Sequence, residues 1–200
     1  MIGAIHEIRG KLIAVLVVGV AAMAAMGIMT MNGVFGGVAS ARAVAAPFVL
    51  HLQIRTGAMT HRSGWPRYLA NGRDSARIVL PAHRVIKVIL TSPDTGSAPV
   101  VAAEARTMGL SGGEVINGVR TMAVPANRVA HTFTVAALGV NVVVPVASAR
   151  RPETIVAYFR TGGPGVYTWQ CMAPCGTGST GWGGPMTTPG YMMGQIVVKA

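Results

Sequence analysis

The sequence predicts an all-β sandwich preceded by one N-terminal transmembrane helix. Two observations carry this prediction: an uncharged run from 12 to 41, and short β-branched segments separated by turn signals from residue 48 onward. Of the 200 residues, 51% are hydrophobic and only 12% are charged, against about 25% in an ordinary soluble domain. This composition excludes an intrinsically disordered chain, which requires low hydrophobicity and high charge.

The uncharged run begins with an almost continuously apolar segment, 12–31. A helix of this length, at about 1.5 Å per residue, spans about the 30 Å of a bilayer's hydrocarbon core. Arg9 and Lys11 stand immediately before it, so the positive-inside rule places the N-terminus in the cytoplasm and the rest of the chain outside. The alternative is a cleaved signal peptide, because 39–41 is a small-x-small cleavage site. Either way, the remainder of the chain is exported.

This interpretation divides the chain into four parts. They are a cytoplasmic N-terminus at 1–11, a transmembrane anchor or signal peptide at 12–34, a small-residue linker at 35–47 and an exported domain at 48–200. The predicted location is the cell membrane, with the domain on the periplasmic or extracellular side.

Nine segments of the exported part are typical of β-strands: 48–55, 77–80, 84–91, 98–102, 115–122, 128–135, 154–160, 166–170 and 195–199. In the third, Ile86, Val88 and Leu90 alternate with Val85 and Lys87, as in a strand with one covered face. Strands this short, separated by Gly, Pro and Asn, favour a sandwich or a barrel.

The distribution of Lys and Arg indicates which classes of partner the chain could bind. The formal net charge is +11, but the 17 Lys and Arg residues are scattered singly, except for the pair Arg150 and Arg151. Because no continuous basic stripe is present, we expect no nucleic-acid partner. A positive surface instead favours acidic proteins or anionic lipid headgroups.

The sequence offers little support for an enzyme acting alone. Its six acidic residues are dispersed and form no carboxylate pair, and no G-x-S-x-G motif occurs. The glycines of 176–181 match G-x-G-x-x-G, but Trp-Gly-Gly-Pro follows them instead of a helix, and no acidic residue follows Glu153 to bind a ribose. We therefore expect no nucleotide.

Both cysteines, Cys171 and Cys175, lie in one late loop that also contains methionines. Thiolates and thioethers select Cu(I), zinc or iron–sulfur centres. Two cysteines are too few for an iron–sulfur cluster, and a structural zinc site would need two more strong ligands, although no Cys or His follows Cys175. Copper fits best by elimination if a histidine reaches the loop. His131 is the candidate, on an otherwise apolar strand face where a core histidine is the commoner role.

The segments VPANRVAHTFTV, GPGVYTWQCMAPCG and YMMGQIVV resemble the cupredoxins, above all the periplasmic domain of cytochrome c oxidase subunit II. The resemblance is loose over 48–200 and good over 125–198. It implies a Greek-key β-sandwich that binds copper. It also implies that His131 is the first copper ligand, Cys171 and Cys175 are bridging thiolates, and Met186 is the weak thioether ligand.

The chain departs from that family at one ligand. The family's second histidine belongs four residues after the second cysteine, where this chain has Ser179, and no histidine follows His131. The loop before Met186 is also longer than the family's, so another methionine could serve equally well. The remaining candidates are Met192 and Met193 for the thioether and His51, His61 and His83 for the imidazole.

Two cysteines in an oxidising compartment also fit a disulfide, and both interpretations remain open. The leading function is electron transfer by a membrane-anchored copper protein, either a carrier or an oxidase subunit II-like respiratory subunit. One alternative is a non-redox accessory subunit of a membrane complex with a Cys171–Cys175 disulfide and no metal. The other is Cu(I) delivery or storage. The expected partners are the membrane and a redox protein or larger oxidase complex.

Overall fold

The computed structural model describes residues 45–59, 64–98 and 100–200, which lie in one compact unit, Ala43–Ala200. The predicted anchor and most of the predicted linker lie outside the described residues. No helix within the three described ranges is long and apolar enough to span a bilayer. The structure thus defines the fold of the segment predicted to be the exported domain.

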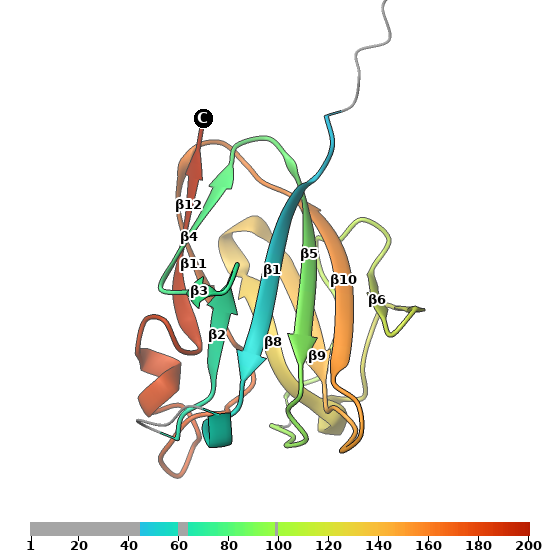
Figure 1. Ribbon diagram of the computed structural model, residues 1–200, viewed down its shortest axis with the longest axis vertical. Coiled ribbons are helices and arrows are strands. Elements are labelled where there is room, and N and C mark those ends of the chain that lie inside the picture. Colours follow the sequence, from blue (N-terminus) through green and yellow to red (C-terminus); the bar gives the residue numbers. More distant parts are fainter. Residues whose placement is uncertain (1–44, 60–63, 99) are drawn as a thin grey trace, which may run out of the picture. The chain divides into compact units, whose positions relative to one another are not determined.

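Two β-sheets make up this unit (Figure 1). The first has the order β3 (Arg73–Asp74), β2 (Arg67–Ala70), β1 (Phe48–Arg55), β5 (Val85–Ser92), β10 (Glu153–Arg160), β6 (Glu114–Ile116) and β7 (Val119–Thr121). The second has the order β4 (Arg77–Pro81), β12 (Met193–Lys199), β11 (Gly165–Gln170), β8 (Val129–Val135) and β9 (Val140–Pro145). The prediction of an all-β sandwich is confirmed.

The chain changes sheets between β3 and β4 and returns between β4 and β5. As a result, each sheet contains one parallel pair, β1 with β5 and β4 with β12, while the other neighbours are antiparallel. Four short 3₁₀ turns complete the elements: η1 (Gly57–Met59), η2 (Ala126–Arg128), η3 (Ala136–Leu138) and η4 (Gly184–Thr187).

The core lies between the two sheets and follows from the period-2 pattern of the strands. In β5, Ile86, Val88 and Leu90 are buried while the residues between them are half-buried, as predicted. In β1 the buried positions are Leu50, Leu52 and Ile54, and the residues between them are exposed.

Three aromatic side chains occupy the middle of this core. The rings of Tyr68, Phe133 and Trp169 lie 5.2–6.0 Å apart between centroids. Their polar atoms are satisfied, because the Tyr68 hydroxyl donates to the Thr132 carbonyl at 2.9 Å and Trp169 Nε1 donates to the Ser75 carbonyl at 3.0 Å. A buried aromatic that keeps its hydrogen bond contributes area without a desolvation cost. This cluster joins β2 to β8 and β11.

Strands β8 and β9 are buried on both faces, unlike the strands of a sheet with one solvated side. The segment between β5 and β8 covers them, and Met108 exchanges two backbone hydrogen bonds with Asn141 of β9, at 3.0 and 3.2 Å. Because β9 is buried on both faces, its sequence shows no alternation of apolar and polar residues. This is why β9 is not among the predicted strands.

The other differences from the prediction are local. Residues 98 and 100–102 form coil and a turn instead of the predicted strand, since Pro99 offers no N–H to a sheet. The predicted strand 115–122 is a hairpin of β6 and β7, and its turn uses positive φ at Asn117 (48°) and Gly118 (88°). The short strands β2 and β3 are also absent from the prediction.

Glu114 ties the two sheets together. Its carboxyl group starts on β6 and its Oε2 accepts a hydrogen bond from the Val143 N–H of β9 at 3.0 Å. The side chain is fully buried, and its Oε1 has no hydrogen-bond partner among the described residues. Burial raises the pKa of Glu114 to about 8, although the Val143 N–H acts in the opposite direction. The carboxyl group is therefore protonated at neutral pH.

This burial predicts a pH dependence of stability. Between the ordinary carboxyl pKa, about 4.5, and about 8, the folded chain holds a proton that the unfolded chain releases, so Glu114 lowers the free energy of unfolding as pH rises. The slope is at most about 1.4 kcal/mol per pH unit. Denaturant unfolding of wild type and Glu114→Gln across this range measures the effect. The free energy of unfolding of wild type should fall relative to that of the variant as pH rises. A constant difference would contradict a protonated Glu114.

Candidate metal centre

The candidate site residues come from three separate parts of the fold. His131 lies in β8, beside a register shift between Val129 and His131. Cys171 follows the last residue of β11, and Cys175 lies four residues later in the same loop. Met186 belongs to η4. The structure brings all four together, although His131 is far from the others in sequence.

The donor atoms form a chain of close contacts. His131 Nδ1 lies 3.9 Å from Cys171 Sγ, which lies 3.6 Å from Cys175 Sγ, which in turn lies 3.5 Å from Met186 Sδ. The ligand atoms of the histidine and the two cysteines all lie within 4.8 Å of one another. His131, Cys171 and Met186 are buried, and Cys175 is partly exposed.

The three consecutive contacts are compatible with donors that share one ion. For a tetrahedral ion with bonds of about 2.3 Å to sulfur and about 2.0–2.1 Å to nitrogen, neighbouring ligand atoms are roughly 3.5–3.8 Å apart. The observed contacts of 3.5, 3.6 and 3.9 Å are close to these edges. One imidazole, two thiols and one thioether form a soft donor set, which favours copper over hard cations. The residues present therefore fit a copper ion.

The cysteines are free thiols in the structure. Burial alone would raise the pKa of Cys171, but hydrogen bonds from Cys175 and His131, together with the Thr132 N–H at 3.4 Å, hold that pKa well below its usual range. The neighbouring Cys171 and burial raise the pKa of Cys175. The pKa values of the two thiols therefore shift in opposite directions: Cys171 gives up its proton more readily than Cys175.

His131 is the partner that shifts the pKa of Cys171 and is itself shifted by it. Burial would lower the pKa of His131, but hydrogen bonds to Asp94 and Cys171 outweigh burial and raise the pKa to about 9. The contact to Asp94 is short, with 2.8 Å between Nε2 and Oδ2. Asp94 is not among the predicted site residues. Its only sequence signal is its place in the turn 92–94, which indicates no more than a strand boundary.

The loop that carries the cysteines is fastened to β8 by Thr132. Its N–H donates to Cys171 Sγ at 3.4 Å, and its Oγ1 accepts from the Met172 N–H at 2.7 Å. From Thr132 a buried hydrogen-bond chain continues through Thr134 to Asn141, with contacts of 2.8 and 2.6 Å. A fully satisfied buried network of this kind rigidifies its surroundings.

Ser179, the position of the family's second histidine, is exposed. Residues 177–183 close on themselves, because Thr177 and Gly183 exchange two backbone hydrogen bonds at 2.9 and 3.0 Å. Of the other histidines, His51 and His83 are exposed on β1 and in the turn before β5, and His6 and His61 lie outside the described residues. Within the described part of the chain, His131 is the one imidazole of the cluster.

Among the methionines, Met186 has its sulfur in the cluster. Met192 is also buried, but it contacts the loop through its backbone, accepting from Cys171 N–H at 2.8 Å and donating to the Pro185 carbonyl at 3.1 Å. Met193 begins β12 and is half-buried. Met186 is therefore the best placed of the three thioether candidates.

A pocket of about 290 Å³ opens beside the cluster. Its lining includes Asp94, His131, Pro174, Cys175 and Gly176. The pocket gives solvent or a partner access to Cys175, the partly exposed sulfur, and to the carboxylate behind His131.

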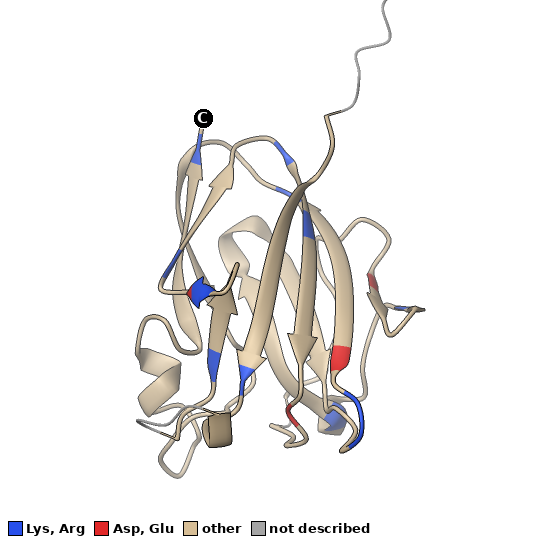
Figure 2. Ribbon diagram, in the orientation of Figure 1, with Lys and Arg blue, Asp and Glu red and all other residues tan. Residues whose placement is uncertain are grey.

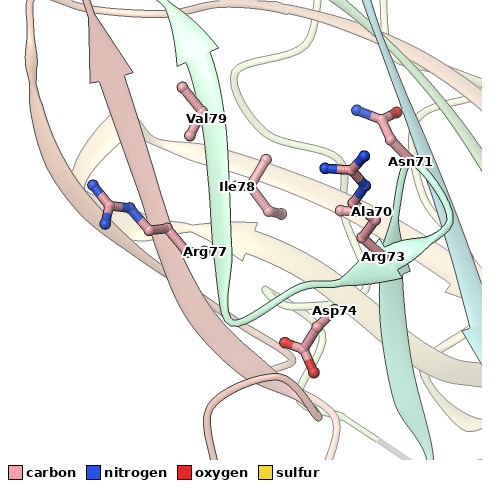
Figure 3. Close-up of a pocket in the computed structure, with 7 residues that line it drawn as sticks. All are labelled: Ala70, Asn71, Arg73, Asp74, Arg77, Ile78 and Val79. Atoms are coloured by element: carbon pink, nitrogen blue, oxygen red, sulfur yellow. The ribbon is translucent and has the colours of Figure 1, made fainter.

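A second hollow, of about 400 Å³, lies away from the cluster between the β2–β3 hairpin and β4 (Figure 3). It is lined by Ala70, Asn71, Arg73, Asp74, Arg77, Ile78 and Val79. Figure 3 shows the guanidinium groups of Arg73 and Arg77 pointing in different directions, so they do not converge on one ligand.

Comparison with known proteins finds a likeness among solved structures. No protein-family model matches the chain. No curated protein matches it either. Among solved structures, a chain of a heme-copper terminal oxidase dimer gives a TM-score of 0.38 at 16% identity, covering 76% of this chain and 63% of the oxidase chain.

Rusticyanin from Thiobacillus ferrooxidans gives 0.35 at 16% identity, covering 76% of each chain. Reduced rusticyanin gives 0.35 at 16% identity, covering 78% of this chain and 82% of that one. The chain spans less than two thirds of the oxidase chain. At these identities and TM-scores, the likenesses assign no residue role here.

The packing around Gly176 predicts a loss of metal affinity on substitution. A Cβ at this position would lie 2.2 Å from the Gly183 carbonyl oxygen and 2.6 Å from Met186 Cγ. Gly176→Ala should therefore displace Met186 and weaken Cu(I) binding at least tenfold, about 1.4 kcal/mol. A competition titration with a Cu(I) chelator measures this.

Gly178→Ala is the matched control. Gly178 has φ +82°, and no atom lies within 4 Å of the place where its Cβ would be, so alanine there costs backbone strain without a clash. Its Cu(I) affinity should stay at the wild-type value. Equal Cu(I) affinities for the two variants would contradict a role for the close packing around Gly176 and Met186 in copper binding.

Proposed function

We propose that this chain is a cupredoxin-like copper protein that transfers single electrons. The observation that carries the proposal is the convergence of four soft donors, His131 Nδ1, Cys171 Sγ, Cys175 Sγ and Met186 Sδ, at spacings that suit one ion. A copper ion bound there would supply one-electron chemistry by alternating between Cu(I) and Cu(II).

The protein's contribution is to hold these donors in place. His131 is fixed in a strand that is buried on both faces, and Thr132 fastens the cysteine loop to that strand through two hydrogen bonds. Donors that cannot relax favour electron transfer, because little rearrangement accompanies a change in metal charge. The hydrogen bond from the Thr132 N–H also stabilises negative charge on Cys171 Sγ, a kind of contact that tunes a metal site.

We propose one copper ion per chain, in contrast to the bridged pair implied by the subunit II resemblance. A second ion would need its own imidazole, and Ser179 stands exposed where that histidine is expected. One imidazole and three sulfurs would be enough donors for a single four-coordinate site.

Cu(I) delivery or storage is the second candidate. Three of the four donors are sulfur, which favours Cu(I), and Cys175 is partly exposed on a pocket through which a bound ion could leave. A metal-free accessory role with a Cys171–Cys175 disulfide is the third candidate, and the experiment below separates all three.

Copper loading of the full chain tests the proposal. We expect one copper per chain, an intense thiolate-to-Cu(II) absorption band and the paramagnetic resonance of a single copper nucleus. His131→Ala should lose the band and weaken binding at least a hundredfold, about 2.7 kcal/mol. His83→Ala, which removes an exposed imidazole, should leave both unchanged.

The other outcomes each contradict the electron-transfer proposal. Tightly bound Cu(I) that resists oxidation and shows no band would favour delivery or storage. A Cys171–Cys175 disulfide in the protein as isolated, with no bound metal, would favour the accessory role.

We further propose that the chain is anchored in the cell membrane by 12–34, exposes the copper domain outside the cytoplasm and exchanges electrons with an acidic redox protein or a membrane oxidase complex. Basic residues support the partner proposal. Figure 2 shows them at both ends of the sandwich, including the end of β1 and the loop before β10. Arg55 ends β1 beside the pocket residues Thr56 and Gly57, and Arg128 precedes the buried start of β8.

This surface predicts a salt dependence. The rate of oxidation by the anion ferricyanide should fall as salt shortens the screening length from about 30 Å at 0.01 M to about 8 Å at 0.15 M. Arg55→Gln and Arg128→Gln should each lower the low-salt rate by about twofold or more. Lys199→Gln, the same loss of charge at the C-terminal end of β12, should have a smaller effect. Equal effects at all three positions would contradict docking near the cluster.

A further inference from the structure

We propose that Asp94 is the positioning residue of the copper site, orienting His131 so that Nδ1 faces the metal and increasing the preference of the site for Cu(II). This inference rests on the proposed function. Asp94 Oδ2 lies 2.8 Å from His131 Nε2, on the side of the ring opposite the 3.9 Å contact between Nδ1 and Cys171 Sγ.

The two ring nitrogens therefore have separate tasks. A ring N–H that donates to a carboxylate fixes which nitrogen remains for a metal, and it makes the imidazole a stronger ligand. Because Asp94 engages Nε2, the nitrogen left for a ligand bond is Nδ1, which already lies 3.9 Å from Cys171 Sγ. Without Asp94, no described group would hold Nε2, and the ring could bind through either nitrogen or rotate away.

Asp94 can orient the ring because its own position is fixed from both sides. Its Oδ1 accepts from the Gly96 N–H at 2.9 Å, and its own N–H donates to Ser92 Oγ at 3.3 Å. Its carbonyl accepts from the Ala147 N–H, beyond β9, at 2.7 Å. The carboxylate is thus held between the end of one sheet and the segment that follows the edge strand of the other.

The buried surroundings strengthen the electrostatic effect of the Asp94 carboxylate on His131. His131 is 1% exposed, and the Asp94 side chain is 22% exposed, on the wall of the pocket beside Cys175. No other carboxylate in the described ranges hydrogen-bonds a member of the cluster. A negative charge hydrogen-bonded to the imidazole favours the more highly charged metal ion, opposing the preference for Cu(I) that three sulfurs create.

The chain contains a matched control carboxylate, Asp74. Its Oδ1 also accepts a backbone N–H two residues on, from Ala76 at 2.7 Å, and its Oδ2 also forms an ion pair, with Arg67. Asp74 therefore shares the local geometry of Asp94 but contacts no member of the cluster. Asp94→Asn and Asp74→Asn remove the same charge from the same kind of turn.

The test compares Cu(II) and Cu(I) affinities and the reduction potential of the full chain. Loss of such an outer partner typically weakens metal affinity about 10–100-fold. We expect Asp94→Asn to lower Cu(II) affinity by that factor, to change Cu(I) affinity less, and so to raise the potential by about 59 mV for each tenfold change in their ratio. Asp94→Glu should recover part of the loss. Asp74→Asn should match wild type in both quantities.

A second readout needs no copper. The N–H proton of the buried His131 ring should be detectable by NMR in the wild-type chain and in Asp74→Asn, and it should exchange rapidly in Asp94→Ala. If wild type binds copper but Asp94→Asn and Asp74→Asn have the same reduction potential, this inference alone is overturned. A wild-type chain that binds no copper would overturn the proposed function and this inference together.

Discussion

The attachment of the cysteine loop to β8 is the interaction on which the rest of the site depends. Thr132 donates its N–H to Cys171 Sγ and accepts the Met172 N–H on its hydroxyl, so one residue holds both the first sulfur and the backbone that follows it. Because Thr132 follows His131 in the strand, this contact also brings the imidazole beside the thiol. At the start of the loop, Cys171 also donates its N–H to the Met192 carbonyl.

Burial gives this attachment its strength. Strand β8 is covered by the opposite sheet on one face and by the β5–β8 connection near the other, so its hydroxyls and amide find partners only within the protein. The Thr132–Thr134–Asn141 chain satisfies them. The same low-polarity surroundings strengthen the pairing of His131 with Asp94 and Cys171, because charges interact more strongly where water is excluded. Packing of the sandwich therefore also affects the chemistry of the site. The buried strand holds His131 and the cysteine loop in place, and the exclusion of water strengthens the electrostatic interactions among them.

The loop 177–183 shows how the site can differ from the family that it resembles. Where the family has a histidine, this chain forms a loop that is closed by the Thr177–Gly183 hydrogen bonds and exposes Ser179. The chain after the loop places Met186 beside Cys175. Gly176 permits this placement because no side chain would fit between Gly183 and Met186. The loop leaves a donor set of one nitrogen and three sulfurs. The balance between Cu(I) and Cu(II) at such a site depends on the groups around the imidazole, and Asp94 is the charged one.

The sequence by itself determined the sandwich, most of its strands, the alternation of β5 and the soft donors of the late loop, because these depend on local periodicity and on residue chemistry. It did not reveal β9, whose two buried faces remove the alternation by which a strand is recognised. The hairpin within 115–122 does have a sequence signal, because Asn117-Gly118 is a favoured two-residue hairpin turn, but the prediction of a single strand leaves it out. The sequence offered His131 as a candidate partner of Cys171, and the family resemblance supported the pairing, but nothing in local periodicity determines that they meet. Asp94 and the choice of Met186 over Met192 were decided by the tertiary structure alone, because both depend on which segments the two sheets bring to the same end of the sandwich.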